Sequence, residues 1–385
     1  MATAAHPARL RAPRGHRSAG EPTGQPAVPV RTLLLLPAGG TLLVGLLGGV
    51  GLLDVGLDDR LSGLTDVHGP LMVLGFLGTL IALERAVAAR VGWAYTAPLL
   101  TGGGALVAIA PATRAAGVVL LTGGLLVLLL VYRSLWLRGR DDLVLVQAAA
   151  AGSAVLASVL WPRTDVATAL PWLIGFVVLT IAAERVELAR LEIRHGSDIL
   201  VGLTTAYLLA GAATLLWPRV GTRLLALTLL TLTAWLALSD VARRTVRLTG
   251  QARFSAVALL LAYAWLAVAA LTWLAAGPLV TSDAYDTVVH ATFLGFAMSM
   301  VLAHAPVILP AVIRRPLPYR STFWLPFCVL HGGLLVRLLL GHGVPSAGVW
   351  RVGGLLTVLA LVLLPVVLVT AVVRERTPET RRPRP

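Results

Sequence analysis

The chain has 385 residues, of which 57% are hydrophobic and only 13% are charged, and its mean hydropathy is +0.84. This composition is too apolar for a soluble globular protein and indicates a membrane protein. The net charge of +14 does not indicate nucleic-acid binding, because the arginines border apolar segments and no basic domain lies outside them. The single cysteine, Cys328, excludes an internal disulfide, a cysteine metal cluster and a CxxCH heme attachment site.

Apolar segments of membrane-spanning length follow one another along the chain. They lie at 32–53, 68–88, 94–110, 115–137, 142–161, 170–188, 198–217, 222–240, 254–275, 285–310, 322–341 and 349–373. We therefore predict an all-α, polytopic membrane helix bundle of about 12 transmembrane helices, which occupies residues 31–374. A disordered N-terminal tail, 1–30, and a C-terminal tail, 375–385, are expected on either side.

Arginines concentrate in alternate loops and in both tails, as Arg133, Arg185, Arg243 and Arg314 illustrate. By the positive-inside rule, both termini are predicted to lie in the cytoplasm, and the expected location is the cell membrane. The same arginines are suited to contact anionic lipid headgroups, so the lipid bilayer is the expected partner.

Three of the segments share a pattern. The second and the sixth carry Gly-Phe, Ile-Ala and Glu-Arg pairs at the same spacing, and these pairs end with Glu84-Arg85 and Glu184-Arg185. The tenth repeats the Gly-Phe pair, and His304 stands where the others have glutamate. This recurrence predicts three four-helix repeats. The two glutamates are either interfacial charges at helix ends or members of a polar, proton-handling site.

Histidines enter the bilayer at two distant points of the chain. His68 opens the second segment and His290 the tenth, and their predicted depths differ by roughly 3 Å at about 1.5 Å per residue. His304 lies about 21 Å deeper than His290, and His331 lies near mid-membrane in the eleventh segment. Neutral imidazole is a common ligand of heme iron, copper and zinc, so these four are the candidate metal ligands. The alternative is that each is a hydrogen-bonded packing residue between helices.

Two further features bear on these candidates. Arg337, about one turn inside the end of the eleventh segment, is either a partner for heme propionates or a snorkelling side chain. His195 and His342 lie in loops and are expected to be solvated.

The motifs HGPLMVLGF, which begins at His68, and HATFLGFAMSMVLAHAPVILPAV, which begins at His290, carry a family resemblance. With twelve predicted spans, the chain resembles the heme–copper oxidase subunit I superfamily, and more closely its NnrS-like branch. The resemblance implies that His68 and His290 hold a low-spin heme. NnrS-like proteins are heme- and copper-containing membrane proteins linked to nitric oxide stress.

The sequence also departs from the oxidase pattern. The tenth segment has no close histidine pair, the seventh has no histidine, and the sixth offers Glu184 where the oxidases bind copper. A complete oxygen-reducing centre is therefore not expected. A single heme b fits better, with copper as the second metal that the pattern allows.

Three functions remain open at this point. The first is a heme-binding redox or nitric-oxide-related protein, whose partner would be an electron-donor protein or a quinone; whether it is an enzyme stays open. The second is a proton-coupled secondary transporter that uses Glu84, Glu184 and His304. The third is a copper-handling factor that uses His290, His304 and nearby methionines.

Overall fold

The computed structural model describes residues 30–56, 63–190, 193, 195–315, 317–343 and 347–374. The predicted tails lie outside the described residues, except for Val30. The helices, in chain order, are α1 (Val30–Leu33), α2 (Leu35–Gly51), α4 (His68–Pro70), η1 (Leu71–Leu77), α5 (Gly78–Ala89), η2 (Gly92–Tyr95), α6 (Thr96–Val107), η3 (Pro111–Thr113), α7 (Arg114–Gly139), α8 (Asp142–Leu160), α9 (Val166–Leu188), α10 (Gly196–Leu216), α11 (Pro218–Ser239), α12 (Ala242–Thr245), α13 (Gly250–Ala276), α14 (Ser282–His290), η4 (Ala291–Met298), α15 (Ser299–Ile313), η5 (Ser321–Phe323), α16 (Trp324–Leu334), η6 (Leu335–Leu340), α17 (Gly341–Gly343) and α18 (Ala347–Arg374).

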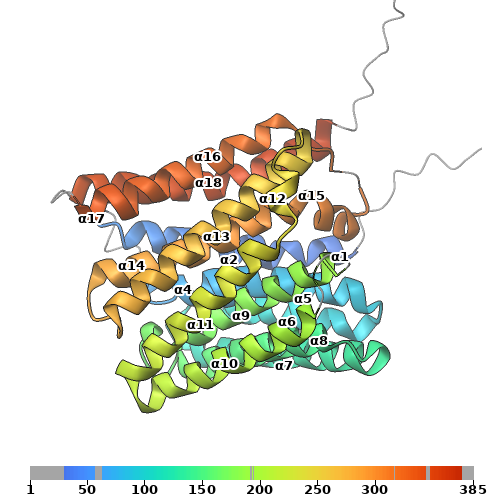
Figure 1. Cartoon of the computed structure of the whole chain (residues 1–385), viewed down its shortest axis with the longest axis horizontal. Helices are drawn as coiled ribbons and strands as arrows, with labels where there is room; N and C mark the ends of the chain where they lie inside the picture. The colour runs from blue at the N-terminus through green and yellow to red at the C-terminus, as the bar shows by residue number, and fades with distance from the viewer. Residues whose placement is uncertain are drawn as a thin grey trace, which may run out of the picture.

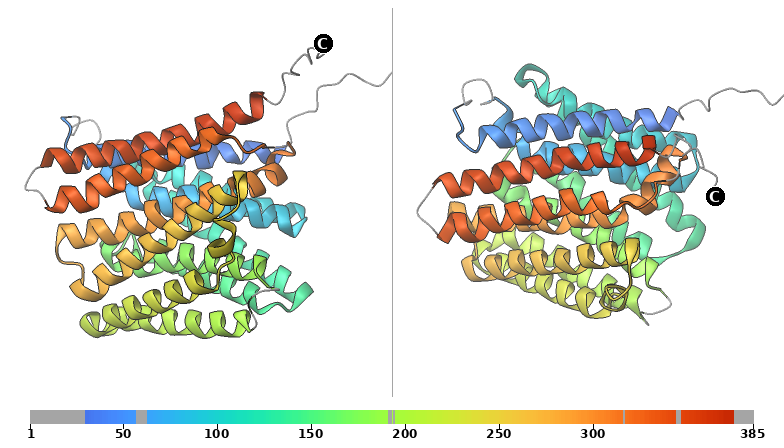
Figure 2. Two further views of the ribbon diagram at one scale, coloured as in Figure 1. Left: turned by 45° about the horizontal axis from the view of Figure 1, so that its top comes forward. Right: turned by 90° about the horizontal axis from the view of Figure 1, so that it is seen from above.

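The long helices lie side by side in one bundle, and all described regular structure is helical (Figures 1 and 2). Eleven helices among the described residues are long and apolar enough to cross a membrane. Large apolar side chains remain exposed along their outward faces, as Leu209 and Val119 do. A bundle with a buried core and an apolar exterior is suited to lipid, so the predicted all-α, multi-pass membrane architecture is confirmed.

One predicted span is wrong in length. The segment 94–110 folds as the turn η2 and the helix α6, which has only 12 residues. At about 1.5 Å per residue, α6 is about 18 Å long, well short of a hydrocarbon core of about 30 Å. α6 packs closely on α7, because Gly104 faces the backbone of Leu121 and Gly117 faces the backbone of Ala108. Any side chain at either glycine would separate the two helices.

The repeated helices meet at the centre of the bundle. η1 and η4 both contact α9, and α5 contacts α15. These elements contain the second, sixth and tenth predicted segments, so the second helix of each proposed repeat contacts the second helices of the other two. Figure 1 shows α4, α14 and α17 at one end of the bundle and α1 and α15 at the other. The end with α4, which begins at His68, is called below the His68 end. The end with α15, which contacts the helix α5 that carries Arg85, is called the Arg85 end.

Candidate functional site

A cavity of about 460 Å³ lies at the His68 end of the bundle. Its walls come from α2, η1, α9, η4 and α18, and most of the side chains that line it are apolar. His68, His290 and Arg337, which lie far apart in the sequence, all line it. The size and lining are those of a cofactor or small-molecule site.

His68 is anchored on α2 by one of its two ring nitrogens. Its Nδ1 lies 2.6 Å from the carbonyl oxygen of Gly45, so Nδ1 carries the hydrogen and donates it. The ring lies against Gly49, where an added Cβ would be 2.9 Å from the imidazole Cε1. Two glycines one turn apart therefore let the imidazole approach the backbone of α2. This bond leaves Nε2 as the unprotonated nitrogen.

His290 is held in the same way by its own helix. Its Nδ1 lies 2.9 Å from the backbone oxygen of Asp286 and 2.8 Å from the carboxylate Oδ1 of the same residue. Both oxygens are acceptors, so Nδ1 carries a hydrogen here also, and in the neutral ring Nε2 is the nitrogen with the free lone pair. A histidine that donates one N–H to a carboxylate or carbonyl is the usual arrangement behind a metal-ligating imidazole.

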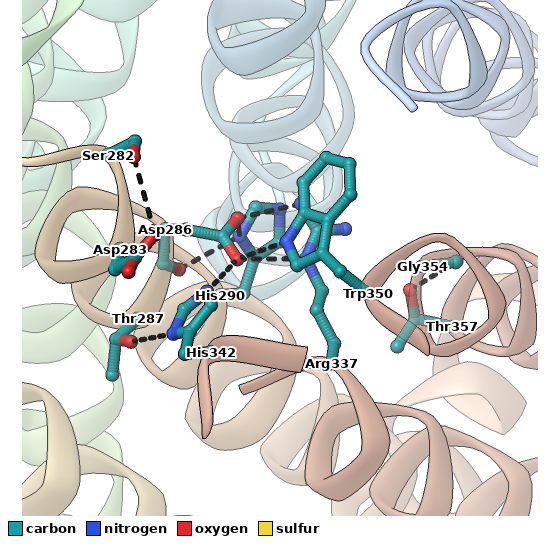
Figure 3. A network of polar contacts seen from close by, with 10 residues as sticks. All are labelled: Ser282, Asp283, Asp286, Thr287, His290, Arg337, His342, Trp350, Gly354 and Thr357. Atoms are coloured by element: carbon teal, nitrogen blue, oxygen red, sulfur yellow. Dashed lines mark hydrogen bonds and ion pairs between the residues drawn. The ribbon is translucent and has the colours of Figure 1, made fainter. Parts of the chain in front are cut away.

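Asp286 is the centre of the polar network shown in Figure 3. Arg337 donates to it through Nε, at 3.1 Å, and through Nη2, at 2.7 Å. Trp350 donates through its indole N–H at 3.0 Å, and Nε2 of His342 lies 3.2 Å away. Asp286 therefore joins α14, η6, α17 and α18, and the guanidinium of Arg337 neutralises its charge.

This network bears on two sequence expectations. Arg337, a candidate propionate partner, donates to Asp286 through Nε and Nη2, and its guanidinium lies over the Trp350 ring, 4.7 Å from the ring centre. His342 was expected to be solvated, but its side chain is only 16% exposed because it packs on Asp286. Asp286 was not among the site residues predicted from the sequence. Its spacing of four residues from His290 was the signal that could have revealed it, since such positions share a helix face.

Three stretches of π-helical backbone adjoin the residues of this site. Among the described residues, the π-helical segments are η1, η4 and η6, which follow His68, follow His290 and contain Arg337. The equivalent stretch of α9 in the middle repeat is ordinary α-helix. Wide turns of this kind are rare and frequently occur at functional sites.

The other two candidate metal ligands lie elsewhere. His331 accepts a hydrogen bond from the indole N–H of Trp265 at Nδ1, at 2.9 Å, and its Nε2 lies 3.2 Å from Oγ of Ser299. Both of its nitrogens are thus occupied by protein, which is the pattern of a packing histidine. Neither His331 nor His304 lines the cavity.

His304 belongs to a charged network at the Arg85 end. Its Nδ1 donates to the carbonyl of Met300 at 2.8 Å, and its Nε2 accepts from Nη1 of Arg185 at 3.3 Å. Arg185 also forms a two-pronged ion pair with Asp240, at 2.9 and 2.8 Å. Burial alone would raise the pKa of Asp240, but the hydrogen bonds and charge of Arg185 and the hydroxyl of Tyr263 hold it below its usual range.

Glu84 and Glu184 meet at a single arginine. Arg85 is paired with its neighbour Glu84 and also donates from Nη2 to Oε1 of Glu184 at 3.2 Å. These three side chains are only 12–23% exposed. The structure thus brings the two predicted glutamates together, but places His304 beside Arg185 instead of beside a carboxylate.

A family profile described as a domain of unknown function, DUF8744, matches residues 31–373. The chain belongs to this family. No protein of curated function matches the chain. The match spans both ends of the bundle, so the histidine-lined cavity and the charged network lie within the region that defines the DUF8744 family.

Two kinds of chemistry are available to this architecture. The His68 end offers two anchored imidazoles in an apolar cavity, a donor set suited to an iron porphyrin or another flat metal complex. The Arg85 end offers two partly buried carboxyl groups, Glu84 and Glu184, that share the guanidinium of Arg85, a set suited to holding a proton.

Proposed function

We propose that this protein binds one heme b between His68 and His290 and serves as a membrane redox protein. One observation carries the proposal: both imidazoles line the same cavity, and each is anchored through Nδ1, which leaves Nε2 as the nitrogen that would bind a metal. The resemblance of the two histidine motifs to the NnrS-like branch of the heme–copper oxidases supports the same assignment.

The residues present fit a porphyrin better than a bare metal ion. Two imidazoles are fewer ligands than copper or zinc sites use, whereas a porphyrin supplies four further nitrogens of its own. The described residues contain no group of three or more histidine, cysteine or acidic side chains that could hold a metal ion. Phe76, Leu173 and Phe293 offer apolar contact to a flat ring.

The two histidine ligands indicate which reaction a bound heme would support. A heme held by His68 and His290 would supply electron transfer, because both imidazoles would then be committed to the iron as ligands. A nitric-oxide-related role would require one imidazole to leave. By the positive-inside rule, the His68 end would face away from the cytoplasm, both termini would lie inside, and a donor protein or a quinone would supply electrons.

A reduced-minus-oxidised absorption spectrum of the purified full chain, produced with added heme, tests the proposal. We expect the sharp bands of a low-spin heme b, and their loss or conversion to a high-spin spectrum in His68→Ala and His290→Ala. His195→Ala is the matched control, because that side chain is 75% exposed and does not line the cavity. A wild-type protein without a Soret band would overturn the proposal and favour the proton-coupled transporter.

A further inference from the structure

The cluster of Glu84, Arg85 and Glu184 carries more negative than positive charge. Two carboxylates share the single guanidinium of Arg85. Arg185, the next cation on α9, is committed to Asp240 by a two-pronged ion pair. An uncompensated charge in a buried site is costly, and two neighbouring carboxyl groups avoid that cost when one of them takes up a proton.

Unpaired polar atoms point to the same place. Tyr132 on α7 is 1% exposed, and its hydroxyl has no hydrogen-bond partner among the described residues. The charges that act on this phenol are those of Arg85, Glu184 and Glu84. Nε of Arg85 is buried and also lacks a partner. Buried polar atoms are nearly always satisfied, so these groups mark a place for a water molecule and an exchangeable proton.

A route to solvent adjoins the cluster. Glu84 lines a cavity of about 820 Å³ at the Arg85 end, together with Arg31, Arg90 and Arg314. Glu184 does not line it, so Glu84 stands between the cavity and the more buried carboxyl. Glu84 is therefore the member of the pair through which protons from this cavity would reach Glu184.

The surrounding charges favour a proton over a metal cation. The charged groups that act on Glu184 are Glu84 and Arg85 on α5, and Arg185 and Glu187 on its own helix. Tyr132 on α7 and His304 on α15 also feel the charges of this cluster, and Arg31, Arg90 and Arg314 line the cavity beside Glu84. A cation between the carboxylates would lie next to the guanidinium of Arg85 and be repelled by it. A proton becomes part of a neutral carboxyl group and avoids that repulsion.

We propose that Glu84 and Glu184 form a proton-binding site that holds one proton between them at neutral pH and exchanges it with the Arg85 side of the membrane. The site stands apart from the heme proposal, since it uses none of the cavity residues at the His68 end. The recurrence of Glu-Arg in the first two repeats is then a means of bringing two carboxyl groups to one arginine.

Infrared difference spectroscopy of the full chain in lipid nanodiscs tests this. A protonated carboxyl has a C=O stretching band that carboxylates lack and that shifts in D₂O. We expect such a band at about pH 7, a pH at which ordinary carboxyl groups are ionised. It should disappear in Glu184→Gln and also in Glu84→Gln, because either change leaves one carboxylate for one arginine.

Two further variants sharpen the outcome. Arg85→Gln should increase the band, since both carboxyl groups then lack a counter-ion. Asp198→Asn, whose side chain is 68% exposed and which is not among the charged groups around Glu184, should leave it unchanged. Absence of the band in the folded wild-type protein, or its persistence in both glutamine variants, would overturn the proposal. So would loss of the band on addition of sodium ions at constant pH, which would assign the site to a cation. Because the wild-type measurement stands alone, misfolding of a variant does not remove the test.

Discussion

Nη2 of Arg85 lies 3.2 Å from Oε1 of Glu184, a residue 99 positions further along the chain. The same relationship recurs one repeat later, where Nη1 of Arg185 lies 3.3 Å from Nε2 of His304. In each case the arginine of one predicted repeat contacts the residue of the next that stands at the position of Glu84, which is Glu184 in the first case and His304 in the second. The third repeat has Ala305 at the arginine position, so the series ends there and Glu84 receives no such partner.

Asp286→Asn should weaken heme binding and raise the reduction potential of the bound heme. The carboxylate accepts the Nδ1 hydrogen of His290, which makes that imidazole a better donor to oxidised iron. Loss of such a partner typically costs about 10–100-fold in affinity. Heme titration and a spectroscopic redox titration check this. Asp283→Asn, on the exposed face of α14, is the control and should change neither value.

Gly49→Ala should lower heme content without unfolding the protein. The new Cβ would stand 2.9 Å from Cε1 of His68, so the ring must turn away from α2 and lose its bond to Gly45. Overpacking of this kind costs about 1–3 kcal/mol. Gly39→Ala, on the same helix, meets nothing within 4 Å and should behave as wild type. Equal heme-to-protein ratios in the two variants would contradict the assigned position of His68.

His331→Leu should reduce stability but leave the heme spectrum unchanged. The substitution leaves the indole N–H of Trp265 buried without an acceptor, at a cost of about 1–3 kcal/mol. Thermal unfolding in detergent measures the loss. A spectral change as large as that of His68→Ala would show that His331 is a ligand after all.

Asp240→Asn should destabilise the protein at neutral pH and much less in acid. The folded-state pKa of Asp240 is depressed, so its contribution is complete above the unfolded pKa of about 4 and is lost as the pH falls through the folded value. Removing one partner of a buried pair such as Arg185–Asp240 costs about 3–5 kcal/mol. Melting temperatures at neutral and acid pH test the sign. Asp198→Asn, 68% exposed, should show no such difference.

The sequence by itself was enough to predict the all-helical, multi-pass architecture, because a membrane span depends on local length and hydropathy. It also predicted nearly equal depths for His68 and His290, which line one cavity, since distance along a helix follows from residue number. The short helix α6 was missed because its glycines read as apolar in composition, whereas their role is close packing on α7.

Only the tertiary structure decided which side chains meet. Asp286 is joined to Arg337 and Trp350, which lie 51 and 64 residues away, and no local pattern reveals such partners. The same holds for His331, which is a packing residue because Trp265 and Ser299 occupy both of its nitrogens. Helix formation in a membrane is governed by each segment alone, but the pairing of buried polar groups depends on which helices become neighbours.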